Sequence, residues 1–279
     1  MMNHTLAWLV WNPNREFFRI PYLDHPVMWY GVIFVTGLLL GYFQMVSLLT
    51  KKLGNKDDAS WLTDKLILYV VIGIIVGARL GHVLFYDFSY TLQHPLSVFM
   101  IWKGGLASHG GTLGVLVALY FYCRSVQKKF PFMTFLTLLD MITIPTSIVA
   151  TFIRLGNFVN QEILGTKTTL PWAIIFGSPY DGSAPTPRHP VVLYEALSYI
   201  LCYLLMRYLW SKYQNSWSPG RLIGIFFIWV YGSRFLLEFF KDDLGHLSIL
   251  PFLQTGQTLS IPFIFLGIFL YFYAKPKKC

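Results

Sequence analysis

Residues 153–165, which read IRLGNFVNQEILG, directly follow a strongly apolar run that covers residues 132–152. A cation, two asparagines and a carboxylate lie within this short stretch: Arg154, Asn157, Asn160 and Glu162. These side chains therefore lie at or just past the end of an expected membrane span. Ionisable groups at this depth cost free energy and are usually functional. A snorkelling arginine at the membrane surface is the plainer interpretation, but it accounts for Arg154 alone and not for the neighbouring amides and acid.

The composition of the 279-residue chain is that of a polytopic membrane protein. Hydrophobic residues make up 55% of it and charged residues only 13%, whereas a soluble domain carries about 25% charged residues. The formal net charge is +9. In a soluble chain this charge would suggest nucleic acid as a partner, but lysines and arginines retained on the cytoplasmic side of a membrane explain it more simply. We therefore expect no nucleic-acid partner.

Seven apolar runs predict an all-α integral membrane protein with seven transmembrane helices. A helix needs roughly 20 mainly apolar residues to cross a bilayer. We interpret residues 1–279 as one polytopic membrane domain, in which the aromatic-rich residues 1–27 form an interfacial segment and not a span. The expected spans cover residues 28–49, 66–85, 109–122, 132–152, 191–210, 222–240 and 259–273.

Basic residues set the expected orientation of these spans. The short stretches 51–64, 124–131, 207–221 and 274–279 hold three lysines or arginines each. The segments between them are longer and less densely basic, so the N-terminus is expected outside, the C-terminus in the cytoplasm, and residues 166–189 in an extracytoplasmic loop. Seven polar residues then fall toward the outer face: Tyr30, Arg79, His109, Arg154, Arg188, His189 and Arg234. We expect them to gather in one outward-facing polar cavity.

Residues 109–114 read HGGTLG and open the third expected span. Gly110 and Gly111 carry no side chain, so a backbone or a ligand can approach closely, and non-helical backbone is tolerated where it lines a cavity. His109 is then a candidate proton acceptor, because an unperturbed imidazole has a pKa of about 6.5. The alternative is a structural histidine that is hydrogen-bonded to a neighbouring helix.

The sixth expected span carries a second intramembrane arginine, Arg234, with Glu238 four residues later. Residues at this spacing share a helix face. One interpretation is an internal ion pair that neutralises both groups, because charges inside a membrane usually pair. The other is that Arg234 belongs to the same functional site as Arg154.

The three cysteines, Cys123, Cys202 and Cys279, are scattered and show no CxxC spacing. They imply neither a disulfide framework nor a metal site, and we expect neither a metal nor another cofactor. The chain also opens without the basic residues that begin a cleavable signal peptide.

Two blocks carry a family resemblance. Residues 109–114 resemble the HGG-x-x-G block of prolipoprotein diacylglyceryl transferases, and residues 154–165 resemble that family's signature, R-x-x-N-F-x-N-x-E-x-x-G. Thr112 is a departure, since the family more often has an aliphatic residue there. Shorter matches are Trp29-Tyr30-Gly31, Gly77-Ala78-Arg79-Leu80-Gly81, Arg188-His189-Pro190 with Tyr194-Glu195, and Arg234 with Glu238-Phe239-Phe240.

This resemblance implies an enzyme of the bacterial plasma membrane that acts before signal peptidase II. It would move a diacylglyceryl group from phosphatidylglycerol to the lipobox cysteine of a preprolipoprotein, forming a thioether and releasing glycerol-1-phosphate. Its partners would be phosphatidylglycerol, preprolipoprotein signal peptides and membrane lipid. Because the lipid's two tails must stay in the bilayer, we expect the polar cavity to open sideways to lipid.

The residues suit that chemistry. A thiol with a pKa of about 8.5 must become a thiolate, and His109 is the candidate base, with help from Glu162 or Glu238. Guanidinium groups clamp phosphate with two hydrogen bonds. We predict Arg154 as the main phosphate ligand, because it has no acid four residues later, and Arg234 as the supporting one.

The remaining candidates surround these groups. Tyr30, Asn157 and Asn160 would orient the headgroup. The expected catalytic residues are His109, Arg154, Arg234, Tyr30, Glu162 and Glu238, and the expected substrate-binding residues are Arg154, Asn157, Asn160, Gly165, Arg234, Gly110 and Gly111.

Two other classes of protein also place charges in a membrane. A transporter or channel does so, but the chain shows no inverted repeat of the kind many transporters have. A non-catalytic scaffold for lipid or signal peptides would need the arginines but not His109. Substitution of His109 therefore separates the scaffold from the enzyme.

Overall fold

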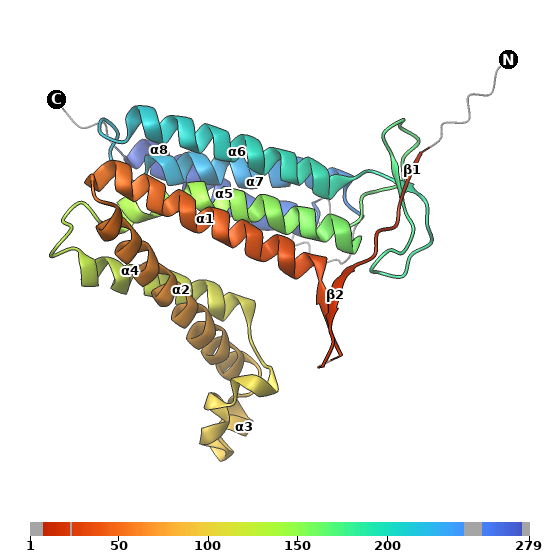
Figure 1. The fold of residues 1–279 in the computed structure, drawn as a ribbon, viewed down its shortest axis with the longest axis horizontal. Helices are drawn as coiled ribbons and strands as arrows, with labels where there is room; N and C mark the ends of the chain where they lie inside the picture. Colours follow the sequence, from red (N-terminus) through yellow and green to blue (C-terminus); the bar gives the residue numbers. More distant parts are fainter. Residues whose placement is uncertain (1–7, 23, 243–252, 275–279) are drawn as a thin grey trace. The chain divides into compact units, whose positions relative to one another are not determined.

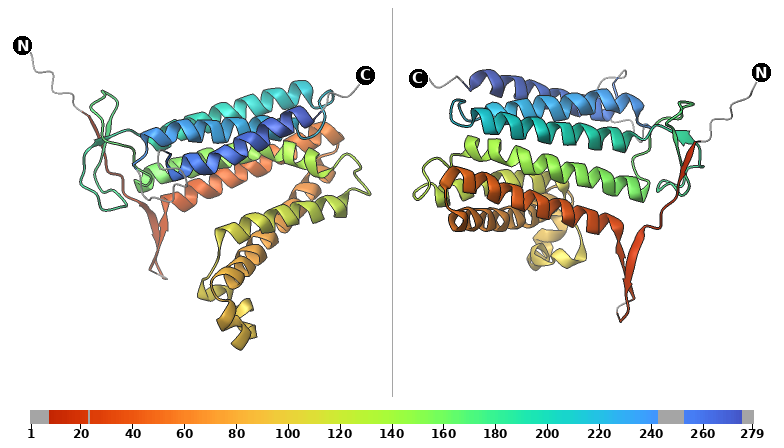
Figure 2. Two further views of the ribbon diagram at one scale, coloured as in Figure 1. Left: turned by 180° about the vertical axis from the view of Figure 1, so that it is seen from behind. Right: turned by 45° about the horizontal axis from the view of Figure 1, so that its top comes forward.

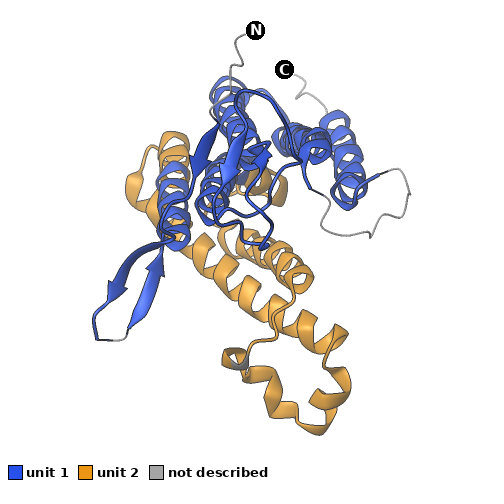
Figure 3. Cartoon of the chain, turned by 90° about the vertical axis from the view of Figure 1, so that its right-hand side faces the viewer, with its two compact units in different colours: residues 1–44, 140–279 blue, residues 45–139 orange. Residues whose placement is uncertain are grey.

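The computed structural model describes residues 8–22, 24–242 and 253–274. The chain divides into two compact units, which are described separately here (Figure 3). Unit 1 comprises residues 1–44 and 140–279, and unit 2 comprises residues 45–139. The helix α1 (Trp29–Leu53) and the helix α5 (Phe135–Asn160) each continue from one unit into the other.

The helices of unit 1 lie side by side along much of their length (Figures 1 and 2). Besides parts of α1 and α5, they are α6 (Val191–Tyr213), α7 (Arg221–Leu237), the short 3-10 helix η3 (Glu238–Phe240) and α8 (Thr255–Tyr273). Glycines allow close approach: a Cβ on Gly37 of α1 would lie 2.6 Å from Phe152 Cβ on α5, and one on Gly224 of α7 would lie 2.8 Å from the Gly267 carbonyl oxygen on α8.

An acid on α5 fixes the beginning of α7. The Asp140 side chain is 6% exposed, and its carboxylate accepts hydrogen bonds from the backbone N–H groups of Gly220 (2.7 Å) and Ile223 (2.8 Å). Gly220 has a φ of +102°, a conformation that glycine adopts without the steric cost of a Cβ. This intramembrane acid is therefore a helix cap.

Six of the seven expected spans coincide with helices that are long and apolar enough to cross a membrane: α1, α2 (Lys56–Phe85), α5, α6, α7 with η3, and α8. The third expected span is also helical, as α4 (Ser108–Val126). It is not one of the six, although it is 19 residues long. The first turn of α4, which contains His109, is polar and glycine-rich, so its apolar stretch is short.

Unit 2 is built on a close pairing of α2 with α4. A Cβ on Gly114 would lie 2.1 Å from the Gly73 carbonyl oxygen, and one on Gly110 would lie 2.3 Å from the Gly77 carbonyl oxygen. Small residues at such positions let two helix backbones pack directly against each other. Between these helices the chain forms α3 (Phe88–Gln93), η1 (Pro95–Phe99) and η2 (Ile101–Lys103).

Arg79 of α2 holds this connection in place. Its side chain is buried, and its guanidinium donates to the carbonyl oxygens of Val98 (2.9 Å), Gly104 (3.0 Å), Gly105 (3.2 Å) and Ser97. Four backbone carbonyl oxygens thus accept hydrogen bonds from the Arg79 guanidinium. The expectation that Arg79 belongs to the outward-facing polar group is therefore replaced by a structural role for its guanidinium.

Two small sheets add to the helices, and the expectation of an all-α protein missed them. The strand β1 (Leu9–Trp11) pairs in parallel with β4 (Ile174–Phe176), which pairs antiparallel with β5 (Pro187–Arg188). The strand β1 thus ties the N-terminal segment to the loop at residues 166–189, and the described residues of this segment, 8–22 and 24–27, contain strands and no helix. Strands of two or three residues carry too little periodicity to be recognised in sequence.

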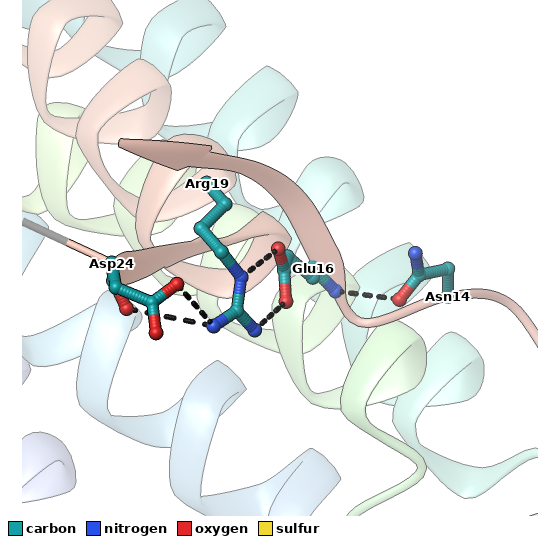
Figure 4. Close-up of polar contacts among 4 residues, drawn as sticks. All are labelled: Asn14, Glu16, Arg19 and Asp24. Atoms are coloured by element: carbon teal, nitrogen blue, oxygen red, sulfur yellow. Dashed lines mark hydrogen bonds and ion pairs between the residues drawn. The ribbon is translucent and has the colours of Figure 1, made fainter. Parts of the chain in front are cut away.

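A hairpin of β2 (Glu16–Ile20) and β3 (His25–Met28) leads into α1. On it the exposed Arg19 donates to Glu16 Oε1 (3.1 Å) and Oε2 (2.9 Å) and to Asp24 Oδ1 (3.0 Å) (Figure 4). Exposed ion pairs of this kind contribute little to stability, because water and salt screen them.

Candidate functional site

The signature stretch folds as the last two turns of α5 and the turn that follows, so the helix continues eight residues beyond the expected span end at residue 152. Arg154 Nη1 donates to Asn157 Oδ1 at 3.0 Å. Asn157 Nδ2 donates to Glu162 Oε2 at 2.6 Å, and Asn160 Nδ2 donates to Glu162 Oε1 at 2.9 Å. Both amides therefore hold the acid of the same stretch, which the sequence alone does not reveal.

Glu162 lies between two residues in the left-handed region, Gln161 (φ +57°) and Ile163 (φ +55°). For a β-branched residue such as Ile163 this conformation is a steric outlier, and strain of this kind is frequent at functional sites. The nearly fully buried Gln161 fixes the turn, because its Oε1 accepts the Ser178 backbone N–H at 2.8 Å and its Nε2 donates to Asn12 Oδ1 at 3.3 Å. The turn thus holds Glu162 in a set position.

A pocket of about 250 Å³ adjoins this turn. It is lined by Gln161, Glu162, Ile163, Leu164, Tyr180 and Asp181. The Ser183 backbone N–H holds the pKa of the Asp181 carboxyl below its usual range. The pocket therefore presents two acidic side chains.

A buried chain of alternating charges starts at Arg154. Arg154 Nε lies 2.7 Å from Glu195 Oε2, and Glu195 Oε1 lies 2.8 Å from Lys241 Nζ. Lys241 Nζ lies 3.0 Å from Glu238 Oε2. Glu195 is only 1% exposed and Lys241 9%. Sequence reasoning did not single out Lys241, and only its position three residues after Glu238 could have suggested it.

These contacts correct the expected pairing of the two arginines. Glu238 pairs with Lys241 and not with Arg234, and the described residues contain no ion pair of Arg234. Arg154, which has no acid four residues later in the sequence, forms an ion pair with Glu195. Sequence spacing identified Arg234 and Glu238 as neighbours on one helix, but α7 ends at Leu237 and Glu238 begins η3, three residues before its partner Lys241.

Backbone pairing joins three segments at the end of the signature. Gly165 forms a bridge with Lys241, Thr166 N donates to the Phe240 carbonyl oxygen at 2.8 Å, and Asp242 N donates to the Leu164 carbonyl oxygen at 3.1 Å. A Cβ on Gly165 would lie 2.2 Å from the His189 carbonyl oxygen. Gly165, expected to bind substrate, is thus required by close packing at this junction.

Arg188 and His189 lie at the same junction. The buried Arg188 donates to the Gly165 carbonyl oxygen at 3.0 Å and pairs with Asp242. The His189 ring shares a hydrogen bond of 3.3 Å with the Tyr194 hydroxyl. Both side chains are therefore occupied in holding the segments together.

Two glycines leave room for the side chains of further candidate residues. A Cβ on Gly156 of α5 would lie 2.8 Å from the Tyr30 ring, so Tyr30 packs against the helix that carries Arg154. A Cβ on Gly256 would lie 2.0 Å from Glu238 Oε1, so the first turn of α8 has room for this carboxylate only because residue 256 is glycine. Arg234 lies on α7 of the same unit. The candidate residues that unit 1 brings together are Tyr30, Arg154, Asn157, Asn160, Glu162, Gly165 and Glu238.

His109 belongs to unit 2 and lies in the first turn of α4. The helix is continuous there, so the expected break at Gly110 and Gly111 is not found: Gly110 packs on α2, and Gly111 would carry a Cβ at an ordinary 3.5 Å from Ala78 Cβ. His109 is exposed and has no hydrogen-bond partner among the described residues. The alternative of a structural histidine bonded to a neighbouring helix therefore has no support within the described part of the chain.

A groove of about 910 Å³ runs between α2 and α4, and His109 is one of its lining residues. The other lining side chains are almost all apolar, among them Leu80, Leu84 and Leu113. Within the described residues no group of three or more His, Cys, Asp or Glu side chains could hold a metal ion.

Comparison with known proteins identifies the family. The family profile described as prolipoprotein diacylglyceryl transferase matches residues 16–273. A phosphatidylglycerol–prolipoprotein diacylglyceryl transferase of Protochlamydia amoebophila is 39% identical, with 96% of this chain and 95% of the relative covered. Relatives of the same name from Tolumonas auensis (39%, with 97% and 99% covered) and Chlamydia trachomatis (37%, with 96% and 99% covered) are similar over nearly their whole length. The chain therefore belongs to the prolipoprotein diacylglyceryl transferase family.

Proposed function

We propose that this protein transfers the diacylglyceryl group of phosphatidylglycerol to the lipobox cysteine of preprolipoproteins. A carbon–sulfur bond forms between the cysteine and the glyceryl carbon, while the bond from that carbon to the phosphate oxygen breaks. The thiol proton passes to a base, and glycerol-1-phosphate leaves. This is the first step of bacterial lipoprotein maturation. The observation that carries the proposal is the signature stretch of residues 154–165, folded into a network that fixes Arg154 and Glu162.

The two arginines stabilise the phosphate as negative charge grows on it during bond breaking. Arg234 is the better candidate for direct phosphate binding, because it has no ion pair among the described residues. Arg154 is oriented by Glu195 and Asn157, and it still has Nη2 without a described partner. This assignment reverses the order of importance that sequence spacing suggested, while both guanidinium groups keep a role.

Headgroup hydroxyls would be held by the amide and phenol groups around these arginines. Asn160 Oδ1 is buried and accepts no hydrogen bond from the described residues, so it suits a hydroxyl donor of the lipid headgroup. Tyr30 packs beside Arg154's helix, within the same unit. Glu162, held by two amides, is the acid nearest to these groups in the signature.

His109 is the proposed base for the thiol, since it is exposed and without a described partner. The glycine-rich first turn of α4 carries it at one end of the groove between α2 and α4. Glu162 or Glu238 would assist it. No metal or other cofactor takes part in the proposed reaction.

The proposed setting is a bacterial plasma membrane. The chain forms a single polytopic domain with α4 as its seventh span, the N-terminus outside and the C-terminus in the cytoplasm. The first 27 residues lie at the membrane interface, residues 166–189 are extracytoplasmic, and a polar cavity opens laterally to lipid. Cysteines introduced at Asn55 and Ser183 should label from opposite sides of the membrane. Labelling of both positions from outside would contradict this orientation.

The native cysteines allow this labelling to be read clearly. Cys123 and Cys202 are buried. Cys279 lies outside the described residues and is best replaced by serine. The introduced cysteines then supply the signal.

Mass spectrometry tests the proposed reaction. A lipobox peptide incubated with the purified protein and phosphatidylglycerol should gain the mass of one diacylglyceryl group. A peptide with serine in place of the cysteine should gain nothing, because a hydroxyl is a far weaker nucleophile than a thiolate at neutral pH. Unchanged cysteine peptide with fully folded protein would refute the proposal.

A further inference from the structure

Glu195 is a buried acid for which the proposed reaction has no direct use. It lies on α6 with 1% of its surface exposed, between Arg154 of α5 (2.7 Å) and Lys241 after η3 (2.8 Å). Neither carboxylate oxygen accepts a hydrogen bond from the described residues. The two cations are therefore its described partners.

The cluster is balanced in charge. Arg154 and Lys241 supply two positive charges, and Glu195 and Glu238 supply two negative ones. An isolated buried charge is strongly destabilising, whereas a paired one is tolerated. Lys241 contacts both acids, so it neutralises Glu195 and also takes up the Glu238 carboxylate, which otherwise would be free to pair with Arg234.

Arg154 is therefore fixed from two sides. Its Nε lies 2.7 Å from Glu195 Oε2 and its Nη1 donates to Asn157 Oδ1, so one acid and one amide hold the guanidinium. Lys241 is itself anchored, because its backbone bridges to Gly165 at the end of the signature stretch. The arrangement links α5, α6 and the end of α7 around one guanidinium.

We infer that Glu195 and Lys241 are positioning residues for this transferase: Glu195 orients the Arg154 guanidinium toward the phosphate of the lipid, and Lys241 holds Glu195 and keeps Glu238 away from Arg234. The inference rests on the proposed function, since it assigns Arg154 and Arg234 to phosphate. Neither residue touches the substrate, so both act through the arginines.

Glu195→Gln is the first test. The amide has the same shape but carries no charge, so the ion pairs with Arg154 and Lys241 are lost. Since a misplacement of about 1 Å can cost about 100-fold in rate, we expect kcat to fall by about 10- to 100-fold. Glu16→Gln is the matched control, because Glu16 pairs with an arginine in the exposed hairpin (Figure 4). Its turnover should stay at the wild-type level.

A double-mutant cycle shows whether Glu195 acts through Arg154. In an Arg154→Lys background, Glu195→Gln should have little further effect, because residues that act as a unit are not additive. Equal fold-losses in the wild-type and Arg154→Lys backgrounds would overturn the inference. Wild-type protein that transfers nothing would instead count against the proposed function itself.

Lys241 variants separate positioning from folding. Lys241→Met leaves the cluster with a net negative charge, and Lys241→Met with Glu195→Gln restores neutrality without restoring the hold on Arg154. The double variant should therefore recover thermal stability but not kcat, and Lys241→Arg should keep both. If activity returns together with stability in the double variant, Glu195 and Lys241 are structural only and the inference is wrong.

Discussion

Gly256 of α8 lies against the carboxylate of Glu238, so closely that a Cβ at residue 256 would be 2.0 Å from Oε1. The absence of a side chain at residue 256 leaves room for the Glu238 carboxylate beside the start of α8, where it pairs with Lys241. It also means that a single methyl group can move this acid without removing any charge.

Gly256→Ala should therefore displace Glu238 and lower the rate of diacylglyceryl transfer by about 10-fold or more, since a misplacement of about 1 Å can cost about 100-fold in rate. Gly232→Ala on α7 is the matched control, because nothing lies within 4 Å of a Cβ there. Initial rates of peptide lipidation for the two variants measure the effect. Equal rates would show that the position of Glu238 is unimportant for transfer.

Asn157 accepts a hydrogen bond from Arg154 and donates one to Glu162. A charge introduced at residue 157 should therefore disturb this arrangement. Asn157→Asp keeps the acceptor for Arg154 but replaces the donor that lies 2.6 Å from Glu162 with a second carboxylate oxygen. We expect the repulsion to open the turn and to reduce transfer at least as much as Asn157→Ala does. Turnover of both variants near neutral pH is the measurement.

The control for Asn157 is Asn55→Asp, since Asn55 caps α2 through its Oδ1 and aspartate caps a helix equally well. That variant should keep wild-type turnover. If Asn157→Asp also kept wild-type turnover, the Asn157–Glu162 hydrogen bond would not contribute to transfer.

His109→Gln should lower transfer by about 100- to 10,000-fold, which is the usual loss when a general base is removed. The protein should remain folded, because no described residue hydrogen-bonds to the His109 ring. His94→Gln, at an exposed position of the same unit, is the control. Near-normal turnover of His109→Gln would assign the proton transfer to another group.

The two glycine positions of α4 separate packing from substrate binding. A Cβ on Gly114 would lie 2.1 Å from the Gly73 carbonyl oxygen, so Gly114→Ala should force α2 and α4 apart and lower thermal stability. Gly111→Ala should leave stability unchanged, since its Cβ would make an ordinary contact at 3.5 Å. Thermal unfolding in detergent compares the two.

Gly111→Ala also tests the expected role of Gly111 in substrate binding. If the stable variant shows a higher KM for phosphatidylglycerol, the substrate approaches the backbone at this point. An unchanged KM would leave Gly111 as a packing residue only.

The sequence by itself predicted most of the helices that are long and apolar enough to cross a membrane, and it predicted the family. Apolar runs long enough to cross a bilayer are a local property, and six of the seven expected spans coincide with helices of that kind. The block at residues 154–165 was recognisable because its polar residues follow such a run at a fixed spacing. The family that this block suggested is also the one that the comparisons identify.

Only the tertiary structure decided which acidic side chain pairs with which basic one. Glu195 lies 41 positions from Arg154 in the numbering of the chain, yet it is the acid that holds Arg154, because α5 and α6 pack together. The spacing of Arg234 and Glu238 predicts that they share a helix face. In the structure, however, the Glu238 carboxylate lies against Gly256 and pairs with Lys241. Sequence spacing fixes neighbours along one helix, whereas a buried charge is stabilised by whichever opposite charge the packing of other helices brings within reach.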